Sequence, residues 1–131
     1  MANIKITKTM KDVLVKKGIA DKSLLLIVDD GGGKYSSGGG ACSIGERFAI
    51  VVLEKDDPEF PIELNNDAGI DLHSSKYSLT FVQDNPILDY QHHNIVLKDD
   101  SGIEDSTVMV TNGAQVLAEA KKGMTHTRET C

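Results

Sequence analysis

The chain of 131 residues is long enough for one domain with its own hydrophobic core, and 40% of its residues are hydrophobic. Its formal net charge of -6 at pH 7 repels a phosphate backbone, so we expect no nucleic-acid partner. No apolar run approaches the ~18 residues of a membrane-spanning helix, and residues 1–5 lack the apolar core of a secretion signal, so we expect a cytoplasmic protein without a membrane partner.

A short strand and a helix are predicted at the start of the chain. Residues 3–7 form the strand, and Thr7 is a suitable N-cap for a helix over residues 8–17 that stops at Gly18. The apolar stripe of this helix consists of Met10, Val13 and Leu14. Their i, i+3, i+4 spacing is typical of a helix that packs with one face against a sheet.

The predicted strands over residues 23–29 and 48–55 contain two continuous apolar runs, residues 24–28 and 48–53. A strand with one solvated face alternates apolar and polar residues, whereas a strand covered on both faces reads as a continuous apolar run. We therefore expect these two strands to form the middle of the sheet.

The middle of the chain carries shorter β-prone segments. Residues 61–64 begin with a proline, which suits an edge segment, and residues 70–73 show a brief alternation. Residues 77–82 alternate like a half-buried strand, and residues 88–93 follow them after a turn, so the pattern predicts a hairpin between the two. Residues 94–98 either extend the second strand or form another.

The four histidines show no spacing that marks a catalytic base, and a histidine remains an alternative to Cys131 as a further metal ligand. His92 and His93 fall within the predicted strand and would project to opposite faces, so they cannot both bind one ion. His73 lies in the short segment before the predicted hairpin, and His126 lies near the end of the chain.

The last third of the chain is predicted to turn from acidic loop to strand to helix. Residues 99–105 read as an acidic loop, and residues 107–110 as a short strand. Residues 113–122 contain good helix formers, with Asn112 as a possible cap. We expect a single domain over residues 1–123 and a flexible tail over residues 124–131.

The most unusual stretch is residues 31–45, which contain seven of the 12 glycines and lie between the two predicted central strands. Ordering so many glycines is entropically costly, which indicates that the loop must stay thin enough for a bound group to approach. Its Cys42 is flanked by glycine, alanine and serine, which suits an accessible thiol; an inert, buried cysteine is the alternative.

Nucleotide-binding motifs fail in this loop. A phosphate-binding loop needs Ser or Thr after its lysine, whereas Lys34 is followed by Tyr35. A dinucleotide fingerprint opens a helix, whereas an apolar strand follows this loop. The acidic clusters elsewhere do not match the register of a calcium-binding loop.

Together these features resemble the HesB-like, or A-type, iron-sulfur biosynthesis domain over most of residues 3–100. The resemblance rests on the helix 8–17, the strands 24–28 and 48–53, the loop Gly38-Gly-Gly-Ala-Cys42-Ser, and Leu88-Asp89-Tyr90 followed by residues 94–97. It implies a small β-rich α+β fold with a mixed sheet, a short N-terminal helix and a C-terminal helix. It also implies a homodimer that holds iron or an iron-sulfur cluster through the loop cysteine.

The sequence departs from the A-type pattern after Leu97. The family's Cys-Gly-Cys is missing there, because residues 98–105 read Lys-Asp-Asp-Ser-Gly-Ile-Glu-Asp. The chain is closer to a subgroup without this pair. A cluster is normally held by four thiolates, so Cys42 and Cys131 reach that number only in a dimer.

Three hypotheses follow from these residues. The leading one is a non-enzymatic accessory protein that binds iron or a cluster transiently and contacts iron-sulfur assembly proteins, with Cys42 and Cys131 as metal ligands and Gly39 and Gly40 giving the metal close access. The second is a HesB-like protein-binding module that has lost its cluster site. The third is a thiol enzyme with Cys42 as nucleophile, which predicts rapid alkylation near neutral pH.

Overall fold

The computed structural model describes residues 2–28 and 47–113. Their elements are β1 (Ala2–Asn3), β2 (Lys5–Ile6), α1 (Lys8–Lys16), β3 (Ser23–Val28), β4 (Phe48–Leu53), β5 (Ile62–Asn65), β6 (Asp71–Ser74), α2 (Lys76–Leu79), β7 (Ile87–Gln91), β8 (Asn94–Asp99) and β9 (Gly102–Asn112). This confirms the predicted β-rich α+β class with a short N-terminal helix. The predicted helix 113–122, apart from its first residue, and the tail lie outside the described residues.

The strands form a mixed sheet in the order β1-β5-β6-β3-β4-β9-β8-β7-β2. β3 and β4 pair antiparallel at its centre, whereas β6 runs parallel to β3 and β9 runs parallel to β4. Both central strands are buried along almost their whole length. The prediction that the two continuous apolar runs form the middle of the sheet is confirmed.

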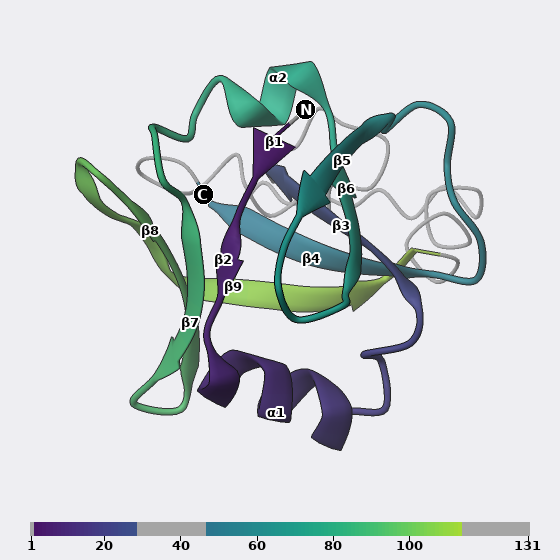
Figure 1. Ribbon diagram of the computed structural model, residues 1–131, viewed down its shortest axis with the longest axis horizontal. Helices are drawn as coiled ribbons and strands as arrows, with labels where there is room; N and C mark the ends of the chain where they lie inside the picture. Colours follow the sequence, from purple (N-terminus) through teal and green to yellow (C-terminus); the bar gives the residue numbers. More distant parts are fainter. Residues whose placement is uncertain (1, 29–46, 114–131) are drawn as a thin grey trace, which may run out of the picture.

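The N-terminal segment curls the sheet by pairing with both of its ends. Ala2 pairs with Leu64 of β5, and Lys5 pairs with Ile87 of β7. Between these pairs the backbone changes partner at Ile4, whose N–H donates to the Asn65 carbonyl at 2.9 Å. Figure 1 shows β1 and β2 as one extended segment that runs from β5 to β7. The two ends of the sheet are therefore covered by the chain itself instead of being left as open edges.

The side chains of the two central strands alternate between two apolar layers. The larger layer includes Leu24, Leu26, Phe48 and Ile50, and it is completed by residues from α1 and from both ends of the sheet. The opposite face of the same strands carries the second layer, Leu25, Ile27, Ala49, Val51 and Leu53, with Phe60 packed against it. Every member of this second layer is at most 7% exposed.

Helix α1 begins and ends as predicted. The Thr7 hydroxyl accepts from the Met10 N–H at 3.2 Å and donates to Asp89 Oδ1 of β7 at 2.7 Å, so the cap also ties the helix to the sheet. Met10 and Leu14 are buried in the larger layer. The chain leaves the helix at Gly18, whose φ of 74° is a conformation that glycine adopts without strain. No helix among the described residues is long and apolar enough to cross a membrane.

The predicted strand over residues 77–82 is wrong. Residues 76–79 form the short helix α2, capped by Ser75, whose hydroxyl accepts from the Ser78 N–H at 3.1 Å. The alternation of apolar residues there is too brief to outweigh a serine cap that satisfies the first helical donors.

The hairpin of β7 is formed with β8 instead, which settles the role of residues 94–98. Gln91 pairs with Asn94, and His92 and His93 form the two-residue turn between them with φ values of 51° and 68°. Positive φ at both central residues is the geometry that matches the twist of a tight hairpin. The two histidines therefore lie in an exposed turn and not on a strand.

Three further predictions are corrected by strand pairing. The acidic loop 99–105 contracts to a turn, because Asp99 pairs with Gly102 and β9 continues to Asn112. The short strand predicted at residues 107–110 is part of this longer one. β5 is one strand in from the end of the sheet, because β1 pairs with it.

Candidate functional site

The predicted site residues Cys42, Gly39, Gly40 and Cys131 lie outside the described residues. The structure does define where the segment that contains Cys42 leaves the sheet and returns to it. β3 ends at Val28 and β4 begins at Phe48, and these two residues are directly paired. The intervening chain therefore leaves and rejoins the sheet at two neighbouring positions at one end of the central hairpin. We call Val28 the first root and Phe48 the second root of the Cys42 segment.

The first root is held by two serines, Ser74 at the end of β6 and Ser78 in α2. The Val28 N–H donates to the Ser78 hydroxyl of α2 at 3.1 Å, in a buried position. Two residues earlier along β3, the Leu26 carbonyl accepts from the fully buried Ser74 hydroxyl at 2.6 Å. The Ser74 bond extends the connection between β3 and β6 beyond the backbone pairs, which reach only Leu25 and His73, and the Ser78 bond joins the end of β3 to α2.

The second root is held by a buried carboxylate. Asp105 of β9 is 8% exposed, and its Oδ2 accepts from the Phe48 N–H at 2.7 Å. Its Oδ1 accepts from the N–H of Thr107 at 2.9 Å and from the hydroxyl of Thr107 at 3.2 Å. Because three donors face its two oxygens, the carboxylate is stabilised in a position that an unpaired charge could not occupy.

Sequence reasoning missed these anchors. Ser74 and Ser78 carry no signal in the sequence, since the pattern after residue 76 predicts a strand, and the sequence places Asp105 in an acidic loop. The one available signal was that Asp105 is followed closely by β-branched residues at the start of the β-prone run. Such a run predicts a strand, but it does not predict which of its polar residues points inward.

A second cluster of polar side chains lies at the opposite end of the hairpin, where β3 begins. The Ser23 hydroxyl is 2.8 Å from Asp56 Oδ1 and 3.0 Å from Asp71 Oδ2. Nδ1 of His73 is 3.1 Å from Asp71 Oδ1. One ligand atom from each of Asp56, Asp71 and His73 lies within 4.8 Å of the other two, so the three can share a metal ion. None of the three was singled out as a ligand by sequence reasoning.

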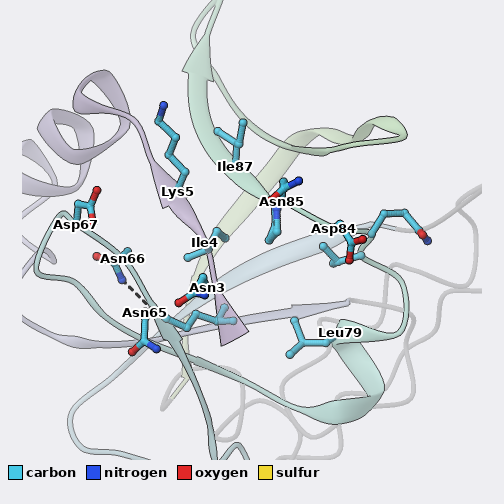
Figure 2. A pocket seen from close by; sticks show the side chains of 14 residues that line it. Asn3, Ile4, Lys5, Asn65, Asn66, Asp67, Leu79, Asp84, Asn85 and Ile87 are labelled. Atoms are coloured by element: carbon cyan, nitrogen blue, oxygen red, sulfur yellow. Dashed lines mark hydrogen bonds between the residues drawn. The ribbon is translucent and has the colours of Figure 1, made fainter. Parts of the chain in front are cut away.

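A groove of about 890 Å³ follows the segment that closes the sheet (Figure 2). Asn66 and Asp67 lie on one side of it and Asp84 and Asn85 on the other, with Ile4 between them. The lining consists of Asn3, Ile4, Lys5, Leu64, Asn65, Asn66, Asp67, Leu79, Val82, Gln83, Asp84, Asn85, Pro86 and Ile87.

The polar groups of the groove include side chains that the fold itself uses. The amide of Asn66 donates to the carbonyls of Leu64 and Ile70, both at 3.0 Å, and its oxygen accepts from the N–H groups of Ala68 and Ile70, both at 3.1 Å. Asn85 donates to Asp100 Oδ2 at 3.0 Å. These amides hold the turns on either side of the groove.

Asp89, from the Leu-Asp-Tyr signature, joins the first helix to the β7–β8 hairpin. Burial acts to raise the pKa of this carboxyl, but hydrogen bonds from Thr7, Gln91, the Tyr90 N–H and Lys98 together outweigh it and hold the pKa below its ordinary value. Lys98 Nζ is 3.5 Å from Asp89 Oδ2. The signature residue is therefore a structural connection between α1 and the β7–β8 hairpin at neutral pH.

Comparison with known proteins gives a family and a fold. The family profile described as iron-sulphur cluster biosynthesis matches residues 2–112. The crystal structure of a candidate Fe-S biosynthesis protein from Lactobacillus acidophilus is 35% identical and superposes with a TM-score of 0.82, covering 93% of this chain and 99% of that one. A second candidate Fe-S biosynthesis protein, from Lactobacillus salivarius, shares the fold at 24% identity, with a TM-score of 0.65 over 84% of this chain and 97% of that one. No curated protein matches the chain significantly.

Proposed function

Because the chain belongs to the iron-sulphur cluster biosynthesis family, we propose that it is an accessory protein of cluster assembly that binds iron or a cluster transiently through Cys42. The observation that carries this proposal is the match over residues 2–112, which includes the glycine-rich segment and both strands that flank it. The buried bonds at Val28 and Phe48 support it, because they fix the two points between which the Cys42 segment must run.

The ligand count points to a homodimer. The chain has two cysteines, Cys42 and Cys131, and a cluster is normally held by four thiolates. Two copies of the chain supply four thiolates without the Cys-Gly-Cys of A-type carriers. Iron or a cluster is the cargo in this scheme, and the proposed partners are the iron-sulfur assembly proteins that load and unload it in the cytoplasm. No chemical conversion is assigned to the chain, so we do not propose that it is an enzyme.

The test is anaerobic reconstitution of the reduced full-length protein with iron and sulfide, read by visible absorption and by iron and sulfide content per chain. We expect a cluster spectrum in the parent and its loss in Cys42→Ser, because serine is a poor ligand at neutral pH. Cys131→Ser is the parallel variant, and it should weaken the spectrum if both thiols bind. Size-exclusion chromatography before and after loading reports the proposed dimer. An unchanged spectrum in Cys42→Ser would refute the ligand role.

A second function is favoured by the missing Cys-Gly-Cys. In this alternative the chain is a protein-binding module of the same family that has lost its cluster site, and it acts through contacts with assembly proteins alone. It predicts a colourless protein after reconstitution, with the far-UV circular dichroism of a folded β-rich domain. A cluster spectrum that depends on Cys42 would exclude it.

A further inference from the structure

The Asp56, Asp71 and His73 cluster is separated from the roots of the Cys42 segment by the length of the central hairpin. Ser23, which contacts both carboxylates, is the first residue of β3, and Val28 is the last. Five steps along a strand span about 17 Å. The cluster and the roots of the Cys42 segment therefore lie at opposite ends of the central hairpin.

We propose that Asp56, Asp71 and His73 form a binding site for a divalent transition-metal ion, of which Zn²⁺ is the simplest probe. Their ligand atoms lie within 4.8 Å of one another. Donors at about 2.1 Å from a tetrahedral ion are about 3.4 Å apart, so the most widely separated ligand atoms must close by at most about 1.4 Å when the ion binds. The partial exposure of Asp71 (45%) and His73 (20%) gives the ion access and leaves these side chains room to move.

The backbone places the donors without help from an ion. Asp71 and His73 are two residues apart on β6, so their side chains point to the same face of the sheet. In the parallel pairing of β6 with β3, Asp71 is next to Ser23 and His73 is next to Leu25. Asp56 follows the end of β4 and reaches the same point through its contact with Ser23. Three separate segments therefore converge on one position.

The hydrogen bonding of Ser23 shows that the two carboxylates converge on a single hydroxyl. Its hydroxyl has one proton but lies 2.8 Å from one carboxylate oxygen and 3.0 Å from the other, so it can donate to only one of Asp56 and Asp71 at a time. Lys22, the adjacent residue, forms its ion pair with Glu54 at 3.6 Å. Within residues 2–28 and 47–113, no lysine or arginine forms an ion pair with Asp56 or Asp71. A cation bound between Asp56 and Asp71 would reduce the repulsion between the two carboxylates.

The donor types select the class of ion. Mg²⁺ and Ca²⁺ prefer oxygen ligands alone, whereas an imidazole nitrogen suits Zn²⁺, Fe²⁺, Ni²⁺ and Cu²⁺. Two carboxylates and one imidazole offer three protein ligands, which leaves a tetrahedral ion one position for water or for a group from outside. The proposed site is therefore an open one and not a closed structural site.

The test is calorimetric titration of Zn²⁺ into the full-length protein that carries Cys42→Ser and Cys131→Ser, so that no thiolate competes. We expect one ion per chain, and an affinity at least tenfold lower after a further Asp71→Asn or His73→Gln substitution. Glu63→Gln is the matched control, because Glu63 is the β5 residue paired with His73 and is exposed, but it is not part of the cluster. This control should leave the affinity unchanged. Circular dichroism checks that each variant is folded.

Three results would overturn the proposal: no stoichiometric binding to the folded protein, unchanged binding in both Asp71→Asn and His73→Gln, or an equal loss in Glu63→Gln, which would indicate general attraction to an acidic surface. Since Cys42 is replaced throughout, none of these results bears on the proposed cluster binding, and a failed reconstitution experiment does not bear on this site.

Discussion

Replacing Asp105 by alanine tests the buried anchor at the start of β4. The substitution removes the acceptor of the Phe48 N–H and both contacts with Thr107. Phe48 is 1% exposed, so water cannot take the place of the lost oxygen, whereas Thr107 is exposed and its groups can bond to water. The cost is therefore concentrated in one buried N–H.

An unpaired buried donor costs about 1–3 kcal/mol, and a lost bond to a charged acceptor lies at the upper end of that range. We expect Asp105→Ala to lower the free energy of unfolding by about 2–3 kcal/mol. Asp105→Asn keeps one acceptor oxygen but turns an amide donor toward either Phe48 or Thr107, so we expect an intermediate loss of about 1–2 kcal/mol.

The measurement is equilibrium unfolding in urea, followed by circular dichroism, with Asp67→Ala as control. Asp67 is an exposed carboxylate in the turn between β5 and β6, and its removal should change stability by less than about 0.5 kcal/mol. If Asp105→Ala is no less stable than this control, the Phe48 N–H does not depend on Asp105, and the reasoning about the second root is wrong.

Two further predictions concern the connection between α1 and β7. The pKa of Asp89 is lowered in the folded chain from its ordinary value of 3.8, so the unfolded chain takes up a proton more readily as the pH falls. The stability from this carboxylate is complete above pH 3.8 and is lost as the pH falls through the pKa of the folded chain. The melting temperature of the parent should therefore drop more steeply between pH 5 and 2.5 than the melting temperature of Asp89→Asn. Parallel curves for the two proteins would contradict this prediction. Thr7→Ala removes the helix cap and the 2.7 Å bond to Asp89. It should lower the free energy of unfolding, measured by urea titration, by about 1–2 kcal/mol. The control is Thr9→Ala, at an exposed position inside the same helix, which should keep a free energy of unfolding close to that of the parent. A Thr7→Ala protein as stable as Thr9→Ala would show that the cap adds nothing.

The family and the position of its cysteine segment could be predicted from the sequence because their signals are local. Continuous apolar runs on either side of a glycine-rich stretch identify two covered strands and the loop between them. The helix over residues 8–16 carries its own cap, stripe and terminating glycine. Each of these features depends on residues that are close together in the chain.

Only the tertiary structure decided what holds these elements in place, because the contacts join distant parts of the chain. Val28 and Ser78 are 50 residues apart, and Phe48 and Asp105 are 57 residues apart. Nothing in the sequence around Ser78 or Asp105 indicates that its side chain points into the protein interior. For the same reason the sequence does not show the closure of the sheet by residues 2–6 or the proximity of Asp56, Asp71 and His73. Both depend on strand pairing between distant parts of the chain, which no single segment specifies.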